Sequence, residues 1–554
     1  MASFPESREE VSLRCVVSAI AIAAFVFVLP MIVWGYAPTH DFNFHVGNWM
    51  EVARQWRQGI VLPRWAAHAN YGFGEPRFIF YPPLSNFVGA AISLFTPWRA
   101  VPGTFVFLSL VLAGTCMYLL ARERLSSRYA LLAALAYMLN PYEVMLVYKR
   151  MAAAELLACA LFPLVLLYAL RVTEGRPRSI LPLAAAYGAV WLTNAPSAVM
   201  VSYSIFLVFA ALAVSRRSVR PLLSGGAALV LGIAFAAFYI VPAAWEQRWV
   251  DISLALTLPH NRPENNFLRL FPPRLPGGIA SIITVGVINL VLAAVLCWIA
   301  FRRRRPLAVD WWLWVAVTGF AAIFTLPFSI WLWQLLPKMI FVQLPWRWLF
   351  VVNTACALLF AAVMKTFSRR GRLIAAAVPV LIFFVLIGAY ATKGKTGKVS
   401  ELELQMRSEG GVWPEAQYLP RGGAQGPRQS NALLAADSSA AKVQVLKSNS
   451  EHFVLAANSS IQSKLLLNVA WYPVWAATVN GAAAEVRSNH GLIEVSVPPG
   501  SSIVELTFLR TADRTLGGVV SLLAIGVAGI VWCTLRLRQR RSPQPTGRYL
   551  EQQA

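Results

Sequence analysis

An aspartate in a long polar segment near the N-terminus is the residue best placed to do chemistry. The segment follows the first apolar run and reads APTHDFNFHVGNWMEVARQWRQG. Asp41 comes only a few residues after that run, so we expect it near a membrane surface, where a carboxylate base could meet a lipid-linked substrate. Its carboxylate could also cap the next helix by accepting a backbone N–H bond. The two roles are compatible.

The residues after Asp41 predict a helix. His45, Trp49, Val52 and Trp56 recur at i, i+4, i+7 and i+11, which places them on one face of a helix from Phe42 to Gln58. Tryptophan favours the headgroup region of a bilayer, so we expect this helix to lie along the membrane interface.

A second carboxylate with possible chemistry lies farther along the same segment, in NYGFGEPRFIFYPPLSN. Glu75 stands in a Gly-rich stretch beside Arg77, and it is either half of a surface ion pair in a turn or a second catalytic group. The Tyr81–Pro82–Pro83 run that follows predicts the start of a helix, because proline suits the first helical turn.

Other charged residues occur at the ends of apolar runs that we assign to the same side of the membrane. They are Glu143, Lys149, Arg150, Glu155, Glu246, Arg248 and Arg347. Any one of them is compatible with an interfacial anchor or a local ion pair. Together they form a ring of charge that an anionic lipid headgroup could use. Arginine suits phosphate because its planar guanidinium donates two parallel hydrogen bonds.

Composition identifies the kind of scaffold that carries these residues. Hydrophobic residues make up 57% of the 554 residues and charged residues 13%, with a net charge of +24. The basic residues stand in short clusters between apolar runs of bilayer-spanning length, which excludes a nucleic-acid surface. All six cysteines lie inside apolar runs and are expected as small buried hydrophobes.

About twelve membrane spans can be drawn. They cover 13–36, 101–121, 129–147, 156–170, 180–195, 198–214, 222–244, 279–301, 309–328, 347–364, 373–391 and 516–535. Alternate loops are rich in arginine, and basic residues are retained on the cytoplasmic side. Both termini are therefore expected in the cytoplasm, and the first span is expected to be an uncleaved anchor.

The longest polar segments fall on the outside. We expect residues 1–391 to form the membrane domain, including the outside loop 37–100, and 392–515 to form an extracytoplasmic domain. Residues 516–535 are then the last span and 536–554 a basic cytoplasmic tail.

The extracytoplasmic segment predicts a small β-sandwich. It opens with a linker at Lys393–Lys398 and an irregular Gly/Pro stretch at Tyr418–Pro427, and it continues with six or seven short alternating runs. Asn480–Gly481 is typical of a type I′ hairpin turn. The runs are Lys442–Leu446, His452–Ala457, Lys464–Val469, Thr478–Val479, Ala483–Arg487, Leu492–Val497 and Ile503–Leu509.

The sequence lacks the motifs of several common catalytic and metal sites. The sequence has no P-loop, GxSxG or HExxH. His68, His260 and His452 stand apart from any cysteine or carboxylate at ligand spacing, so no metal is expected. We expect no cofactor.

Most of the chain resembles bacterial polytopic membrane proteins of the GT-C glycosyltransferase superfamily. The closest group is labelled "6-pyruvoyl-tetrahydropterin synthase-related", with YfhO-like proteins near it. The resemblance is carried by the first outside loop and by LNPYEVMLVYKRMAAAE, LTNAPSA, VPAAWE, QLPWRWL and WYPVWAATVNG. The label itself does not fit, because a pterin synthase is a small soluble enzyme with a three-histidine zinc site.

The resemblance implies an inverting transferase that uses a polyprenyl-phosphate sugar and acts on a cell-envelope glycan or protein. Such an enzyme lies in the bacterial inner membrane, and its catalytic aspartate, in the first outside loop, corresponds to Asp41. Glu75 is a second candidate for catalysis. The candidates for substrate binding are His40, His45, Arg77, Arg150, Glu155, Glu246 and Arg347.

Two other functions stay open at this stage. A lipid or glycan flippase would thread polar residues through its spans, whereas here they gather at one face. A non-catalytic envelope assembly factor would keep the fold and use the β domain to bind a partner.

Overall fold

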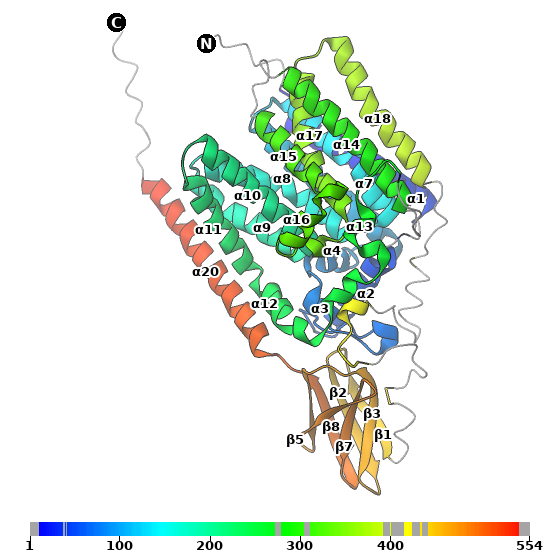
Figure 1. The fold of residues 1–554 in the computed structure, drawn as a ribbon. Helices are drawn as coiled ribbons and strands as arrows, with labels where there is room; N and C mark the ends of the chain where they lie inside the picture. Colours follow the sequence, from blue (N-terminus) through cyan, green and yellow to red (C-terminus); the bar gives the residue numbers. More distant parts are fainter. Residues whose placement is uncertain are drawn as a thin grey trace.

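The chain folds into a helical bundle with a β domain at one end. The computed structural model describes residues 10–36, 39, 41–271, 279–303, 311–391, 399, 415–423, 433–434 and 441–541, with the backbone alone for 535–541. The predicted linker Lys393–Lys398 and most of the predicted basic tail lie outside these residues. In Figure 1 the first polar segment (blue) lies between the bundle and the strands.

The bundle is built from apolar helices, most of them long. In chain order they are α1 (Leu13–Trp34), α5 (Val101–Arg122), α6 (Ser127–Met138), α7 (Pro141–Met145), α8 (Ala153–Thr173), α9 (Ile180–Thr193), α10 (Ala195–Ser215), α11 (Arg220–Phe235), α12 (Ala237–Glu246), α14 (Ile279–Arg302), α15 (Trp311–Ile323), α16 (Ile330–Leu335), α17 (Leu349–Met364), α18 (Arg369–Ala391) and α20 (Ala512–Arg541). The first polar segment forms α2 (Phe42–Arg57), α3 (Arg77–Phe80) and α4 (Leu84–Ile92), and α13 (Pro263–Asn266) is a single turn.

The helices confirm a polytopic membrane protein. Among the described residues, nine are long and apolar enough to cross a bilayer, and two bent pairs raise the number to eleven. The pairs are α11 with α12, bent by 73°, and α15 with α16, bent by 81°. The remaining predicted span corresponds to α9, which has 14 residues and ends at Thr193. The count of twelve therefore stays a prediction.

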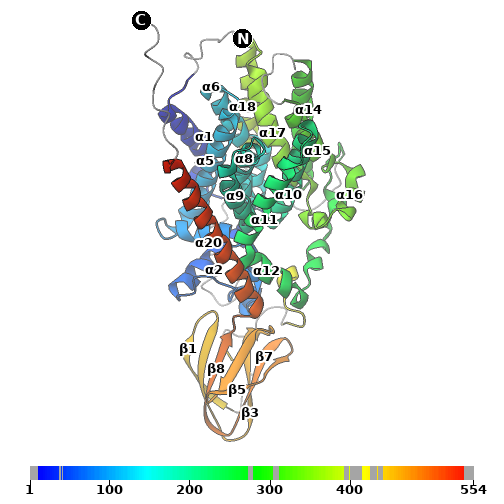
Figure 2. The ribbon, with the colours of Figure 1, turned by 90° about the vertical axis from the view of Figure 1, so that its left-hand side faces the viewer.

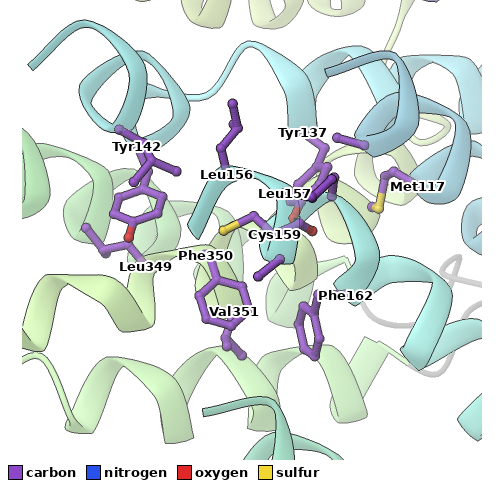
Figure 3. Packing of buried hydrophobic residues seen from close by; sticks show 14 of the residues in the cluster. Met117, Tyr137, Tyr142, Leu156, Leu157, Cys159, Phe162, Leu349, Phe350 and Val351 are labelled. Atoms are coloured by element: carbon purple, nitrogen blue, oxygen red, sulfur yellow. The ribbon is translucent and has the colours of Figure 1, made fainter. Parts of the chain in front are cut away.

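The centre of the bundle is closely packed around α8 and α17. Both are 89% buried in their most apolar windows, whereas α18 and α20 are 11% buried and lie at the periphery. Figure 3 shows side chains of α8 and α17 in contact, and the rings of Phe162 and Phe350 meet edge to face at 5.1 Å. This close-packed centre gives the residues at the ends of α8 and α17 a rigid base.

The arginine-rich loops meet at one end of the bundle. Arg122 pairs with Glu10 at 3.2 Å, and Glu123 accepts from Arg171 at 2.5 Å. The segments after α1 and α12 lie toward the opposite end, which carries the β domain (Figure 2). The alternation of loops that the charge pattern predicts stays a prediction, and so does the end that faces the cytoplasm.

The predicted helix in the first loop is confirmed as α2, but Trp49 packs inside the protein and does not face lipid. The place of α2 along the membrane interface stays a prediction. Trp49 is completely buried and stacks on Phe105 of α5 with ring centroids 4.8 Å apart. The apolar face of α2 is thus covered by protein. The helix start predicted at the Pro82–Pro83 pair is confirmed, because α4 begins at Leu84.

Among the residues that the structure describes, the β domain has eight strands in two sheets. One sheet has the order β1-β2-β8-β4-β5 and the other β3-β7-β6. Every predicted run falls on a strand, and the run Ala483–Arg487 divides between two strands of different sheets. Asn480 and Gly481 both have positive φ, as a type I′ turn requires. The strands are β1 (Ala441–Ser448), β2 (His452–Ser459), β3 (Ser463–Ala470), β4 (Trp475–Val479), β5 (Ala482–Ala484), β6 (Val486–Asn489), β7 (Leu492–Val497) and β8 (Gly500–Phe508).

The β domain shares its core with the first loop. Trp65 is buried against Trp475 and Phe508, with ring centroids 5.6 and 5.4 Å apart. The backbone N–H of Ala470 donates to the carbonyl of Phe73 at 2.8 Å. The two parts of the chain therefore form one packed unit on this end of the bundle.

Candidate functional site

A cavity of about 280 Å³ lies at the end of the bundle that the first loop covers. Its wall comes from segments far apart in the sequence: the start of α2, the end of α3, the joint of α9 and α10, the starts of α8 and α14, and the turns before α17. Among the residues that line it are Asp41, His45, Arg150, Glu155, His260, Gln343, Arg347, Glu415, Gln417 and Tyr418.

Four charged side chains form a chain along this wall. Arg150 donates from Nη2 to Asp41 Oδ2 at 3.0 Å and from Nη1 to Glu155 Oε2 at 2.8 Å. Arg347 donates from Nε to the same Glu155 oxygen at 3.1 Å. Two guanidinium groups thus face two carboxylates, so the cluster is neutral as a whole. The hydroxyl of Tyr142 also donates to Glu155.

Local backbone geometry brings Asp41 and Arg150 together. The chain between α7 and α8 forms a π-helical turn at Leu146–Arg150, and Met151 then adopts the left-handed region at φ 53°. The carbonyl of Arg150 accepts a hydrogen bond from the backbone N–H of Asp41 at 3.0 Å. The backbone and the side chain of Arg150 therefore both hold the start of the first loop.

Asp41 occupies the N-cap position of α2 but does not cap it. Its side chain accepts no hydrogen bond from the first turn of that helix. The predicted capping bond is wrong, because the carboxylate turns to Arg150 instead. The side chain is 33% exposed, and among the described residues its Oδ1 atom has no hydrogen-bond partner. This oxygen is available to a ligand.

Arg347 offers a second group to the cavity. Nη1 donates to the carbonyl of Val342 at 2.7 Å, and Nε is taken by Glu155. Within the part of the chain that the structure describes, Nη2 has no hydrogen-bond partner, and the residue lines the cavity. A guanidinium with one open edge is suited to an anionic oxygen.

His45 is buried on the same wall. Burial lowers the pKa of its imidazole to about 4, so the ring is neutral at pH 7. Its Nδ1 atom finds no partner among the described residues. A neutral ring at this place can donate or accept one hydrogen bond toward a ligand. His40 lies outside the described residues.

Glu75 and Arg77 do not line the cavity, and they are buried rather than exposed as a surface pair. Arg77 Nε donates to Glu75 Oε1 at 2.6 Å, and its Nη1 donates to Asn48 at 3.0 Å. Burial raises the pKa of Glu75 to about 7. The second oxygen of Glu75 accepts a long hydrogen bond, 3.4 Å, from the backbone N–H of Glu415. The predicted pair therefore lies behind the wall and supports it.

Glu246 is placed elsewhere. It pairs with Arg514 of α20 at 2.7 Å and accepts from the hydroxyl of Tyr472 in the β domain at 2.8 Å. Its carboxylate is completely buried in this junction and does not line the cavity. The position of Glu246 suits a structural role, in which it links α12 to α20 and to the β domain. It does not suit the substrate-binding role expected from the sequence.

Sequence reasoning missed the residues that come from the irregular stretch before the β domain. Glu415, Gln417 and Tyr418 all line the cavity. Their segment has no periodicity, and only the fold brings it over the first loop. His260 and Gln343 were missed for the same reason.

The described residues contain no group of three or more histidine, cysteine, aspartate or glutamate side chains that could hold a metal ion. The chemistry on offer is that of an open carboxylate oxygen and an open guanidinium edge on one cavity. The first can accept a proton from a hydroxyl group, and the second can stabilise a phosphate.

Comparison with known proteins identifies the family. The sequence profile of the "6-pyruvoyl-tetrahydropterin synthase related domain; membrane protein" family matches residues 78–393, more than half of the chain. The chain belongs to this family. Within this PTPS-related protein, Arg150, Glu155 and Arg347 lie inside the matched region and Asp41 lies before it. No curated protein matches the PTPS-related chain.

Solved structures with a similar arrangement include an arabinofuranosyltransferase, an oligosaccharyltransferase and ArnT. Arabinofuranosyltransferase AftD from Mycobacteria aligns with a TM-score of 0.44 and 16% identity over 72% of this chain and 28% of its own. The oligosaccharyltransferase of Archaeoglobus fulgidus gives 0.41 and 14% over 70% and 57%. ArnT from Cupriavidus metallidurans, bound to undecaprenyl phosphate, gives 0.38 and 18% over 71% and 68%. The PTPS-related chain thus spans little more than a quarter of the length of AftD.

Proposed function

We propose that this PTPS-related protein is an integral membrane glycosyltransferase of the bacterial cytoplasmic membrane. It transfers a sugar from a polyprenyl-phosphate donor to a cell-envelope acceptor on the outer face. The observation that carries the proposal is the shared cavity of Asp41 and Arg347, each with an open polar edge. One edge suits a reacting hydroxyl and the other suits a phosphate.

The reaction is a single displacement. The acceptor oxygen forms a bond to the anomeric carbon while the bond from that carbon to the phosphate oxygen breaks. The acceptor proton passes to the Asp41 carboxylate, and the electron pair of the broken bond leaves with the polyprenyl phosphate. One displacement inverts the configuration at the anomeric carbon.

The charges around Asp41 support this division of labour. Arg150 holds one carboxylate oxygen and leaves the other toward the cavity, which orients the base. Arg347 presents its open edge for the negative charge that develops on the leaving phosphate. Glu155 lies between the two arginines and keeps both guanidinium groups in place.

One side of the cavity is apolar and suits the lipid part of the donor. Ile279 and Ile282, at the start of α14, line it together with Leu344. The membrane helix α14 is only 33% buried in its most apolar window, so much of its surface is available to lipid. An isoprenoid chain could leave the cavity along this helix.

Substitution of Asp41 tests the proposed function. Asp41→Asn keeps the size of the side chain and removes the base, so transfer should fall roughly 10²- to 10⁴-fold. The envelope glycans of cells that lack the gene would be compared after complementation with the wild-type protein or with Asp41→Asn. The modified glycan should return only with the wild type, while both proteins reach the membrane in equal amount.

Asp251→Asn is the matched control. Asp251 also belongs to a loop at the β-domain end, but its carboxylate accepts from Ser253 and does not line the cavity. This variant should restore the glycan fully. Full restoration by Asp41→Asn would remove the base and favour a non-catalytic envelope factor.

A further inference from the structure

The cavity has a third carboxylate besides those of Asp41 and Glu155. Glu415 belongs to the segment before the β domain, and the 3₁₀ turn Ala416–Tyr418 follows it directly. The ring of Tyr418 stacks on Phe80 of the first loop with an interplanar angle of 2°. The segment is thereby laid over the wall of the cavity.

The same segment is fixed at its other end. The backbone N–H of Arg421 donates to the carbonyl of Trp249 at 2.9 Å, and its side chain donates from Nε to the carbonyl of Val250 at 3.2 Å. Glu415 is therefore held between the first loop and the loop after α12. A side chain on such a support can keep a fixed direction toward a ligand.

Glu415 has one oxygen committed and one open. Gln417 donates from Nε2 to Glu415 Oε2 at 3.0 Å. Oε1 has no hydrogen-bond partner among the residues that the structure describes, and Glu415 forms no ion pair with them. Arg77, whose charge acts on Glu415, donates from Nε to Glu75. An unpaired carboxylate oxygen on a cavity wall is a strong acceptor for hydroxyl groups.

Uncharged polar groups and aromatic rings share the cavity with Glu415. Amide side chains of Asn194, Asn261, Gln343 and Gln417 line the same cavity. So do the rings of Phe80, Tyr81, Tyr418 and Trp346. Amides offer both donors and acceptors, and aromatic faces cover the C–H faces of a ring. Many neutral hydrogen-bonding groups beside flat apolar faces suit a polyhydroxylated ring and not a second phosphate.

We propose that Glu415 and the amides around it bind the hydroxyl groups of the transferred sugar, so that the segment before the β domain selects the donor. This inference rests on the proposed function and adds the part of the cavity that recognises the sugar. Arg347 then binds the phosphate, and Glu415 is a specificity residue that touches the sugar without taking part in proton transfer.

The inference is tested by comparing the binding of the bare lipid phosphate with the binding of its glycosylated forms. The full chain in nanodiscs would be titrated with undecaprenyl phosphate and with a panel of undecaprenyl-phosphate-linked pentoses and hexoses. The wild type should bind one glycosylated lipid more tightly than the bare phosphate. Glu415→Gln should weaken that binding roughly 10- to 100-fold, as expected for the loss of a charge-assisted hydrogen bond, and leave binding of the bare lipid unchanged.

Two further variants separate recognition from folding. Glu415→Asp keeps the charge but shortens its reach, so it should change the preference among the sugars while the thermal midpoint stays at the wild-type value. Glu485→Gln, an exposed glutamate of the β domain paired with Arg487, should change nothing. Equal binding of the bare and glycosylated lipids by the wild type, or equal losses for both lipids in Glu415→Gln, would overturn the inference alone. Binding of neither lipid by the wild type would overturn the proposed function and the inference with it.

Discussion

At the scale of single residues, one buried glutamate organises the site. Glu155 accepts hydrogen bonds from Arg150 and Arg347, and Arg150 in turn holds Asp41. Buried charges are tolerated only when they are paired and hydrogen-bonded. The hydrogen bonds to Glu155 therefore stabilise its charge. They also fix the orientation of the groups that face the cavity.

Glu75 gives a pH-dependent prediction at this scale. Burial raises its pKa from 4.5 to about 7, with Glu415 adding to the rise and Arg77 opposing it. The folded protein then binds this proton more tightly than the unfolded chain. The resulting contribution to the free energy of unfolding is complete below pH 4.5 and is lost as the pH rises to about 7. The loss is about 3 kcal/mol, because the pKa differs by about 2.5 units between the two states and each unit corresponds to about 1.36 kcal/mol.

Thermal unfolding in detergent at pH 5 and pH 8 would measure this effect. The glutamine in Glu75→Gln cannot titrate, so the variant should lose less stability than the wild type between the two pH values. Glu485→Gln should follow the wild type, because Glu485 is exposed. Identical losses in the wild type and in Glu75→Gln would show that Glu75 keeps an ordinary pKa.

At the scale of elements, the contact between α2 and α4 positions the start of the first loop. Gly89 of α4 lies against Trp49 of α2, and a Cβ atom at Gly89 would stand 2.2 Å from the indole ring. Trp49 cannot move away easily, because its other face stacks on Phe105. The glycine therefore permits a close approach of two helices.

Gly89→Ala should destabilise the protein for this reason. Alanine favours a helix over glycine by roughly 0.5–1 kcal/mol, but overpacking costs about 1–3 kcal/mol, so the net effect is a loss. Gly226→Ala in α11 is the control, because a Cβ there meets no atom within 4 Å. The thermal midpoint should fall for Gly89→Ala and stay or rise for Gly226→Ala. A midpoint at or above the wild-type value for Gly89→Ala would refute the tight contact.

Elements with a local signal could be predicted from the sequence. Apolar runs predicted the helices of the bundle, and the Pro82–Pro83 pair predicted the start of α4. Asn480–Gly481 predicted a hairpin turn in the β domain. The surroundings of α2 could not be predicted, because its tryptophan face suits a lipid interface and a protein interface equally well. Only the packing of α5 against Trp49 decides between them.

At the scale of the whole molecule, the β domain packs against the first loop, which in turn supports the site. Glu246 links α12 to Arg514 of the last helix and to Tyr472 of the β domain. Trp65 and Phe73 of the first loop complete the core of the β domain. Removal of residues 395–512 would take away Glu415 and expose this core, so that deletion disturbs the cavity as well as the domain.

Long-range pairs explain why the site could be predicted only in part. The sequence pointed to Asp41 and His45 through the first outside loop, and to Arg150, Glu155 and Arg347 because each stands at the end of an apolar run. All five line the cavity. Position at the end of an apolar run also selected Glu246, because that position does not show whether a side chain lines the cavity or lies elsewhere. Glu415 had no local signal, because only the fold carries its segment back over the first loop.

The central claim is that this cavity binds a polyprenyl phosphate beside Asp41. The most direct measurement is a cryo-EM structure of the full chain in nanodiscs with undecaprenyl phosphate. The account predicts the phosphate within hydrogen-bonding distance of the Arg347 guanidinium, with the isoprenoid chain leaving past Ile279 and Ile282. An empty cavity, with the lipid bound at another surface of the bundle, would contradict it.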